Sequence, residues 1–411
     1  MSRAAARISW LPLLAAFALA AGCEERPAGG IEIRPLDPPA AAGSGQPHTA
    51  PVRGGGVVLS WMEPADGVTA LKHATLTGQG AWSQPATVAS GEQLFVNWAD
   101  VPSIVPISGE TWAAHWLRLI EGSYGAYDVA AAVSNDAGVS WSEPVLLNDD
   151  GTQTEHGFAT LFEWEGDIGA VWLDGRELAQ WSFDEPDALL GVSLRFARLS
   201  FDGRVLERGE IDSLACDCCQ TDVAIARGGP IVIYRDRTED EIRDVVVRRH
   251  VGGQWQPALA LGAEQWRIEG CPVNGPAIDA DDAEVAAAWF TAADGVGRVR
   301  FARSSDGGET FSSAVDVDAD GAFGQVDVAL LGDATAVVSW WRRGTDGRTA
   351  LAARTVAGGG ALGPIVTIAE NAVAQPLDVP EMERAGDALV FAWTDAGEGG
   401  GVRAALVRNL R

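Results

Sequence analysis

The sequence predicts an all-β fold, a β-propeller of four-stranded blades, with seven blades favoured and six as the alternative. Three observations predict it. A short apolar run that ends in an aromatic residue recurs along the 411 residues, further strand patterns flank each copy, and the two chain ends together supply one complete blade. A chain of this length exceeds a usual single hydrophobic core, whereas repeated units each bury a face against their neighbours.

The apolar runs are the clearest repeat. Each is short, is bounded by Gly and Asp, and ends in Trp or, once, in Tyr234. Runs of this length and composition predict strands rather than helices. The copies span 57–61, 112–116, 169–172, 231–234, 285–289, 336–340 and 389–393.

Two other patterns complete each unit. A run of alternating residues, such as 298–303, follows the apolar run and leads through a hairpin to a short fourth strand. Four strands repeated around an axis is the plan of a propeller. A short run opened by Asp precedes several copies and would ring the central channel, either bonding the inner strands or forming an acidic funnel for a cation or sugar hydroxyls. These residues are Asp100, Asp222, Asp327 and Asp378.

The chain ends predict how the ring closes. The last unit, from Pro376, has room for three strands before the final residue. Residues 31–35 form a spare alternating strand near the start of the chain. We expect this strand to complete the last blade, which leaves no open sheet edge.

Two hairpins carry a turn signature. The Asp side chain accepts backbone N–H bonds in the turn, Gly takes a positive φ, and the aromatic residue plugs the sheet stack. One hairpin contains Ser304, Asp306, Gly308, Thr310 and Phe311, and the other contains Ser134, Asp136, Gly138 and Trp141. These hairpins resemble those of the sialidase (BNR/Asp-box) superfamily, and the resemblance covers most of residues 45–411. It implies a structural role for these residues.

The N-terminus predicts export. Arg3 and Arg7 precede an apolar run over 8–21, too short to span a bilayer. Small residues then lead to Cys23, which resembles the lipidation site of a bacterial lipoprotein. An ordinary secretory signal is the alternative. We expect residues 1–22 to be a lipoprotein signal peptide, residues 23–45 a lipid-anchored Pro/Gly/Ala-rich tether, and residues 46–411 the propeller.

The net charge and the predicted lipid anchor limit the partners that we expect for this protein. The formal net charge of −27 repels phosphate backbones, so nucleic-acid binding is disfavoured. We expect a monomer attached to the membrane through its lipid. Glu24 and Glu25 follow Cys23, which favours the outer membrane of a Gram-negative envelope.

Propeller geometry places the chemically rich loops together. Loops that enter the first strand of a blade and loops that leave the second lie on one face, and the Asp-box hairpins lie on the other. The predicted binding residues on the rich face are Trp98, Asp100, His156, Arg176, Gln220, Asp222, Arg235 and Asn274.

Four cysteines fall in two consecutive loops of that face, at Cys216, Cys218, Cys219 and Cys271. An oxidising envelope favours disulfides, whose pairing the sequence leaves open. The alternatives are a redox role and a thiolate metal site with His156 nearby, where soft sulfur ligands favour copper or zinc. Under the favoured interpretation the protein needs no cofactor.

A sialidase needs an arginine cluster for the substrate carboxylate and a Tyr nucleophile. The chain lacks the family's Phe/Tyr-Arg-Ile-Pro motif, and no complete catalytic set can be carried over. The weak catalytic candidates are Asp174, Arg176, Arg235, Asp236 and Arg343. We therefore expect a propeller that binds a glycan, peptide or protein partner. The alternatives are a sialidase-like glycosidase and a metal-handling protein of the envelope.

Overall fold

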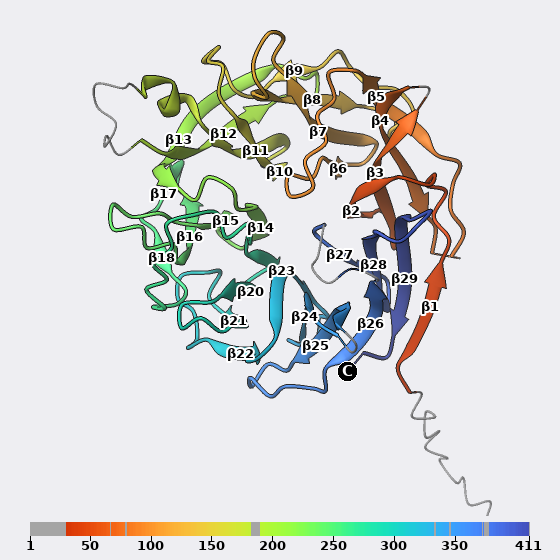
Figure 1. Ribbon diagram of the computed structural model, residues 1–411, viewed down its shortest axis with the longest axis vertical. Coiled ribbons are helices and arrows are strands. Elements are labelled where there is room, and N and C mark those ends of the chain that lie inside the picture. Colours follow the sequence, from red (N-terminus) through yellow and green to blue (C-terminus); the bar gives the residue numbers. More distant parts are fainter. Residues whose placement is uncertain are drawn as a thin grey trace, which may run out of the picture. The chain divides into compact units, whose positions relative to one another are not determined.

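Seven antiparallel sheets stand around one axis in the described part of the unit Ile31–Arg411 (Figure 1). The computed structural model describes residues 30–410, except 66, 79, 182–189, 333, 345–346, 372 and 374–377. The sheets confirm the seven-bladed propeller, so the six-bladed alternative is wrong. The predicted signal peptide and Cys23 lie outside the described residues.

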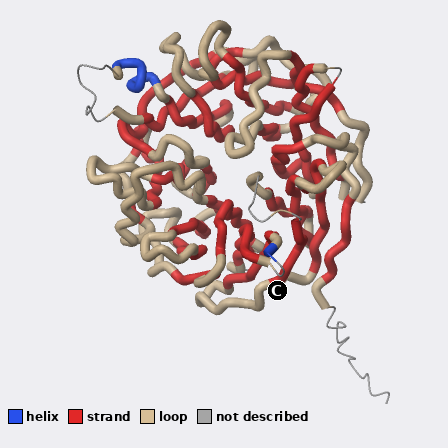
Figure 2. The backbone as a smooth tube through the Cα atoms, viewed as in Figure 1, coloured by secondary structure: helices blue, strands red, loops and turns tan. Residues whose placement is uncertain are grey.

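The blades are numbered 1 to 7 in chain order, and each runs outward from the axis (Figure 2). The innermost strands are β2 (Gly45–Val52), β6 (Ser103–Ser108), β10 (His156–Trp164), β14 (Asp222–Ala226), β19 (Ala277–Asp281), β23 (Ala322–Leu330) and β27 (Glu381–Ala385). The second strands are β3 (Gly56–Ala65), β7 (Thr111–Leu119), β11 (Asp167–Asp174), β15 (Gly229–Arg235), β20 (Glu284–Thr291), β24 (Ala336–Arg343) and β28 (Ala388–Asp395).

The third strands are β4 (Val68–Leu76), β8 (Tyr127–Ser134), β12 (Val192–Leu199), β16 (Val245–Val251), β21 (Arg298–Ser304), β25 (Thr349–Val356) and β29 (Gly401–Arg408). The outer strands are β5 (Ala86–Gly91), β9 (Val145–Leu146), β13 (Val205–Ala215), β17 (Gln254–Trp255) with β18 (Leu259–Ala260), β22 (Val315–Asp318), β26 (Val366–Asn371) and, in blade 7, β1 (Glu32–Leu36). A short 3-10 turn, η1 (Arg176–Gln180), follows β11.

The second strands explain the repeated apolar runs. Neighbouring blades cover both faces of these strands, so their residues are buried almost continuously, as in β20 and β24. A strand covered on both faces is apolar throughout instead of alternating. The hydrophobic clusters accordingly lie between consecutive blades; one, for example, joins Trp172 of blade 3 to Val129 of blade 2.

Blade 7 closes the ring as predicted. Strand β1 pairs antiparallel with β29, from Glu32 opposite Arg408 to Leu36 opposite Ala404. The observed strand begins one residue later than the predicted range 31–35. Leu36 is buried in a cluster with Val57 of blade 1, so the closing strand also packs against the first blade.

The two Asp-box-like hairpins have the same hydrogen bonds. In blade 5, Thr310 N donates to Asp306 Oδ1 over 2.9 Å, and Gly308 N donates to Ser304 Oγ over 2.9 Å. In blade 2, Asp136 and Ser134 accept the equivalent bonds. Gly138 and Gly308 have φ values of 83° and 80°, and Trp141 and Phe311 pack against the blade clusters.

A buried triad of aromatic residue, carboxylate and base recurs around the ring. In blade 1, Trp61 Nε1 donates to Glu63 over 2.7 Å, and Lys72 pairs with the same carboxylate. The carboxylate satisfies the buried indole N–H, and the base compensates its charge. The other triads are Trp172–Asp174–Arg176, Tyr234–Asp212–Arg248, Trp289–Glu264–Arg300 and Trp340–Asp318–Arg342.

Among the residues that the structure describes, no helix combines the length and apolar character needed to cross a membrane.

Candidate functional site

The loops that enter the inner strands of blades 2 to 5 meet at one mouth of the ring. The side chain of Gln220, which precedes β14, joins three of them. Its Nε2 donates to Ala99 O over 2.6 Å, and its Oε1 accepts from Gly275 N over 2.8 Å. We call the surface formed by loops 92–102, 147–155, 216–221 and 270–276 the mouth face. Gln220, a predicted binding residue, makes these loop-to-loop bonds instead of pointing into solvent.

Trp98 stands at the tip of a tight turn on the mouth face. Asp100 N donates to Asn97 O over 3.2 Å, and the Asn97 side chain accepts from Ala99 N over 3.1 Å. An Asn side chain that bonds the backbone two residues on is the usual way to fix such a turn. The turn leaves Trp98 42% exposed, although large apolar side chains are usually buried. A fixed, exposed indole offers an aromatic face on which a ligand can stack.

Two carboxyl groups flank this turn. Asp100 is 1% exposed; no side chain of the described residues bonds its oxygens, and the Phe158 backbone N–H approaches them. Burial, together with the charge of nearby Glu155, raises the pKa of Asp100 to about 7. Partial burial and the charge of Asp217 raise the pKa of Glu155. At neutral pH the carboxyl of Asp100 can therefore both donate and accept hydrogen bonds.

Tyr127 lies beside the same carboxyls. Its pKa is raised by burial and by the charges of Asp100 and Glu155. A nucleophilic tyrosine needs the opposite shift, toward the phenolate. Asp100 and Tyr127 also crowd Gly157, since a Cβ there would lie 1.9 Å from Asp100 Oδ2. Tyr127 thus packs beside the carboxyl of Asp100.

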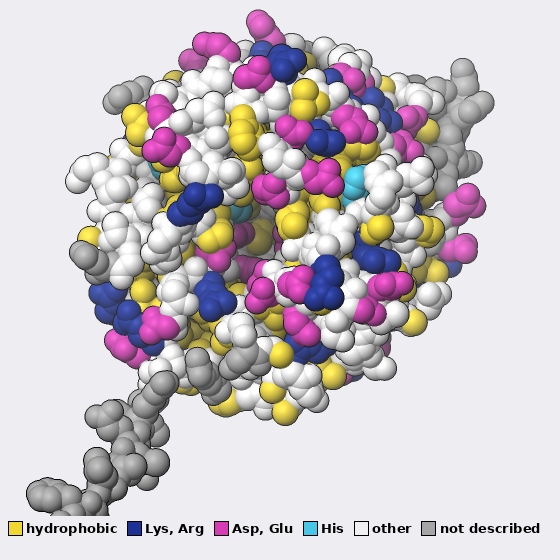
Figure 3. Space-filling view, turned by 180° about the vertical axis from the view of Figure 1, so that it is seen from behind, with side chains coloured by type: hydrophobic (Ala, Val, Ile, Leu, Met, Phe, Trp, Pro, Cys, Tyr) yellow, Lys and Arg dark blue, Asp and Glu magenta, His cyan; other side chains and the backbone are white. Residues whose placement is uncertain are grey.

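The axis of the ring holds a cavity of about 400 Å³. Figure 3 shows a hollow in the middle of one face, with acidic side chains in and around it. The lining comes from the inner strands and their entering loops. The polar lining residues are His48, Thr49, Asp100, Ser103, Thr160, Gln220, Thr221, Asp222, Asp279, Asp327, Glu381 and Glu383.

Three of these carboxylates join consecutive inner strands. Asp222 on β14 accepts from Ile278 N on β19 over 2.8 Å, and Asp279 on β19 accepts from Leu330 N on β23 over 2.7 Å. Asp327 continues the series toward β27. We call this series the carboxylate ladder. It gives Asp222 and Asp327 the first of their two predicted roles, bonding the inner strands.

Burial dominates the electrostatics of the ladder. It raises the pKa of Asp222 to about 6 and of Asp327 to about 8, and neighbouring carboxylates add to both shifts. Asp378, the fourth repeated Asp, is buried and has a pKa raised to about 7. It accepts from Thr394 N within its own blade.

His156 lies beneath the mouth face. It is fully buried, with Nε2 3.1 Å from Asp150 Oδ1 and 3.7 Å from Asp174 Oδ1. Arg176 lies beside the same carboxylate, with its Nε 2.7 Å from Asp174 Oδ1 and its side chain 18% exposed. Since Asp174 and Arg176 are the blade 3 copy of the recurring triad, their pairing has a structural explanation.

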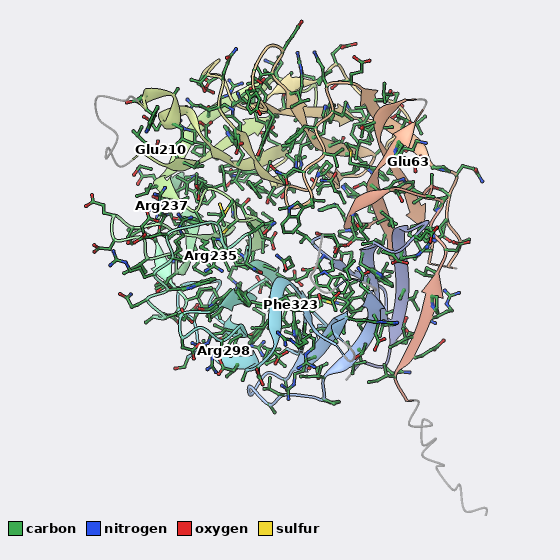
Figure 4. All side chains as sticks on the ribbon, viewed as in Figure 1. Glu63, Glu210, Arg235, Arg237, Arg298 and Phe323 are labelled. Carbon is green, nitrogen blue, oxygen red and sulfur yellow. The ribbon has the colours of Figure 1, made fainter. Side chains whose placement is uncertain are left out.

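Arg235, a predicted binding residue, is 2% exposed. Its guanidinium donates to the carbonyl oxygens of Asn274, Arg243 and Phe290 over 2.7–3.1 Å, and its Cζ lies 4.9 Å from the centre of the Trp266 ring. Figure 4 labels it within the wall of the ring. We therefore correct its role: Arg235 holds blades 4 and 5 together, and its donors are engaged.

The remaining candidates lie apart from this group. The Asn274 side chain donates to Phe323 O and accepts from Gln325 N over 2.7 Å, so it joins blades 5 and 6. Burial and the charge of Asp212 raise the pKa of Asp236 to about 6. Arg343 is exposed at the end of β24. Arg176, Arg235 and Arg343 each have separate surroundings instead of forming one clamp for a carboxylate.

The four cysteines meet where the loops entering blades 4 and 5 adjoin. They are free thiols in the structure. The sulfurs of Cys216, Cys218 and Cys219 lie within 4.8 Å of one another, and Cys218 also approaches Cys271 and Asp217 within that distance. His156, which we expected near these sulfurs, groups instead with Asp150 and Asp174.

Sequence reasoning missed three residues of this region. Asp279 belongs to the ladder, and its place two residues into the predicted inner strand could have indicated this. Glu381 lines the axial cavity. Arg243 donates to Cys216 Sγ over 3.5 Å and to Asp217 Oδ1 over 2.7 Å; nothing in its local sequence connects it to the cysteines.

Comparisons with known proteins place the fold. No protein-family model matches the sequence, and no curated protein matches it either. A PL25 ulvan lyase is similar in structure, with a TM-score of 0.55, 12% identity, and coverage of 92% of this chain and 98% of that one. A protein of unknown function from Dyadobacter fermentans has a TM-score of 0.52 and 13% identity, with coverage of 93% of this chain and 100% of that one. The endosialidase of phage phi92 has a TM-score of 0.51 and 9% identity, with coverage of 92% of this chain and 69% of that one.

These similarities, at such low identity, show the fold alone. The chain is a seven-bladed β-propeller, and its structural neighbours include sialidases and other propellers that act on glycans.

Proposed function

We propose that the protein binds a carbohydrate at the mouth face, with Trp98 as the stacking platform and Asp100 and Glu155 as hydrogen-bonding groups. The observation that carries the proposal is the exposed indole of Trp98, fixed by its turn beside a buried carboxyl that no side chain of the described residues bonds. Sugars present apolar C–H faces and hydroxyl edges, and ligand sites pair aromatic surfaces with a few placed polar groups.

The charge of the site narrows the ligand. Two of the three candidate arginines are already engaged, Arg176 by Asp174 and Arg235 by backbone carbonyls. The third, Arg343, has surroundings separate from theirs. The carboxyls of Asp100, Glu155 and Asp217 remain at the mouth, and the chain has a formal net charge of −27. Such a field repels sialic acids, uronates and sulfates. The ligand is therefore a neutral or amino-sugar glycan.

The fold is consistent with this proposal. Solved propellers of similar structure include an ulvan lyase and an endosialidase, whose names connect this architecture with glycans. Catalysis of the sialidase kind is the second candidate. It has less support here, because the pKa of Tyr127 is raised.

A glycan array with neutral, amino-sugar and acidic members tests the proposal. We expect binding to neutral or amino-sugar members, and a loss of about tenfold or more for Trp98→Ala. Tyr124→Ala is the matched control, because this aromatic residue is fully exposed on the same blade. Binding confined to sialylated or sulfated glycans, or equal binding by Trp98→Ala, would contradict the proposal. Turnover of a fluorogenic sialoside would favour the enzymatic candidate.

We also propose that the protein is held at the cell envelope through a lipid on Cys23. The support is the apolar leader that ends in small residues before this cysteine. Mass spectrometry of the N-terminal peptide should detect a diacylglycerol-modified Cys23, and Cys23→Ser should release the protein from membranes. A Cys23→Ser protein that stays with the membrane fraction would contradict the assignment.

A further inference from the structure

Three sulfur atoms converge beside the mouth face. Those of Cys216, Cys218 and Cys219 lie within 4.8 Å of one another, and the Cys216 and Cys218 sulfurs are 4.0 Å apart. Cys216 is 1% and Cys219 2% exposed, while Cys218 is partly exposed. Buried thiols this close must share protons, form a disulfide or bind a metal ion.

We propose that Cys216, Cys218 and Cys219 form a three-sulfur site for a soft, thiophilic cation, and that this cation is Cu(I). This inference stands independently of the proposed glycan binding. Thiolates select soft metals such as Cu(I). Three ligands at a metal–sulfur distance of about 2.3 Å would be separated by about 4 Å in a trigonal arrangement, which matches the observed separation. Structural zinc sites take four protein ligands, whereas three sulfurs converge here.

The charge around the sulfurs favours thiolate. Arg243 Nη1 donates to Cys216 Sγ over 3.5 Å, and Arg243 is 3% exposed. A second guanidinium, that of Arg235, lies near Cys216. Positive groups beside a thiol stabilise its thiolate, which is the form that binds metals. The two guanidiniums would offset the excess negative charge of a Cu(I) tris-thiolate.

Cys271 provides a route into the site. Cys271 is exposed and does not belong to the three-sulfur group. Its sulfur lies within 4.8 Å of the Cys218 sulfur and of an Asp217 carboxylate oxygen. A cation captured at the surface by Cys271 and Cys218 would pass inward by exchange of one sulfur ligand for another. We therefore assign Cys271 to metal entry and the other three cysteines to retention.

The test uses the purified full chain, reduced and kept anaerobic, titrated with Cu(I) against the chromophoric chelator bicinchoninate. We expect one Cu(I) per chain to be withdrawn from the chelator, and X-ray absorption to show three sulfur neighbours. Cys216→Ser and Cys219→Ser should each weaken binding by on the order of 100-fold. Cys271→Ser is the matched control, which should keep the affinity and slow the loading.

A second measurement keeps the test decisive if a Ser variant misfolds. In the unaltered protein, Cu(I) should protect Cys216, Cys218 and Cys219 from alkylation, as mapped by peptide mass spectrometry, and leave Cys271 reactive. Failure of the reduced protein to compete with the chelator overturns the proposal, as does equal binding by correctly folded Cys216→Ser. Disulfides at these positions in a protein that binds no copper after reduction would assign the cluster to a covalent staple.

Discussion

The carboxylate of Asp327 on β23 accepts a hydrogen bond from the backbone N–H of Met382 on β27, over 2.6 Å. The other oxygen of the same carboxylate accepts from Val328 N over 2.7 Å. One side chain thus joins its own strand to the inner strand of the next blade. Asp222 and Asp279 repeat the arrangement, so the wall of the axial cavity is held by side chains as well as by apolar packing.

The ladder predicts how stability depends on pH. The pKa values of Asp327 and Glu383 are raised to about 8, so the folded state holds these protons more tightly than the unfolded state. Their stabilisation is complete below the unfolded values near pH 4 and is lost as the pH rises toward 8. Over this pH range the free energy of unfolding should therefore fall less steeply in Asp327→Asn than in the unaltered protein. The slopes should differ by up to about 1.4 kcal/mol per pH unit.

Urea denaturation at a series of pH values measures this slope. Asp306→Asn is the control, because the pKa of Asp306 is lowered by its hydrogen bonds with Ser304 and Thr310. That change should leave the slope above pH 5 as it is. An unchanged slope in Asp327→Asn would show that the carboxyl is ionised throughout.

Arg235 should matter for stability before it matters for any ligand. Arg235→Met removes the donors to Asn274 O, Arg243 O and Phe290 O and leaves buried carbonyls without partners. We expect a loss of about 3 kcal/mol in the free energy of unfolding. Arg343→Met, at an exposed position, is the control and should change it by less than about 0.5 kcal/mol. Equal stability of the two variants would return Arg235 to the list of ligand contacts.

The recurring triad allows a comparison within one chain. Asp174 in blade 3 and Asp318 beside blade 6 each accept an indole N–H and pair with an arginine. If Asp174 is structural, Asp174→Asn and Asp318→Asn should each lower the free energy of unfolding by about 2 kcal/mol. Thermal melts of the two variants measure this. A destabilisation seen only in Asp318→Asn would show that the blade 3 copy serves a different purpose.

The closing strand should belong to the cooperative fold. Leu36 is buried with Val57 and Leu406, whereas Ile33 on the same strand is 37% exposed. Leu36→Ala should cost about 2–3 kcal/mol, toward the lower end for a buried leucine. Ile33→Ala should cost well under 1 kcal/mol. Calorimetry that gives a single transition of unchanged midpoint in Leu36→Ala would place β1 outside the cooperative unit.

The architecture could be predicted because its signals are local and repeated. The second strands are covered on both faces, so each stands out as an apolar run ending in an aromatic residue. The last blade has only three strands after Pro376, and one unassigned strand precedes Leu36. These two observations together predicted that the early strand completes the last blade. The gathering of the cysteine loops followed from the same geometry.

The site depended on contacts that no local pattern carries. The carboxylate of the triad follows its Trp by two residues in Glu63 and Asp174, but comes from the preceding blade in Asp212, Glu264 and Asp318. The carboxylate that accepts the aromatic residue's hydrogen bond therefore comes from the same blade in some triads and from the preceding blade in others. For this reason Asp174 and Arg176 resembled catalytic candidates. Arg235 resembled a ligand contact because its three carbonyl partners are not adjacent to it in the sequence.

The pairing of β1 with β29 also affects the order of folding during biosynthesis. Strand β1 is made before the other described strands, but it can pair only after β29, which ends at Arg408, has been made. Until then the nascent chain exposes the flank of blade 1 around Val57 and Leu76, which the final blade later covers. The ring can therefore close only after β29 has been made, and a chain without it leaves this flank of blade 1 uncovered.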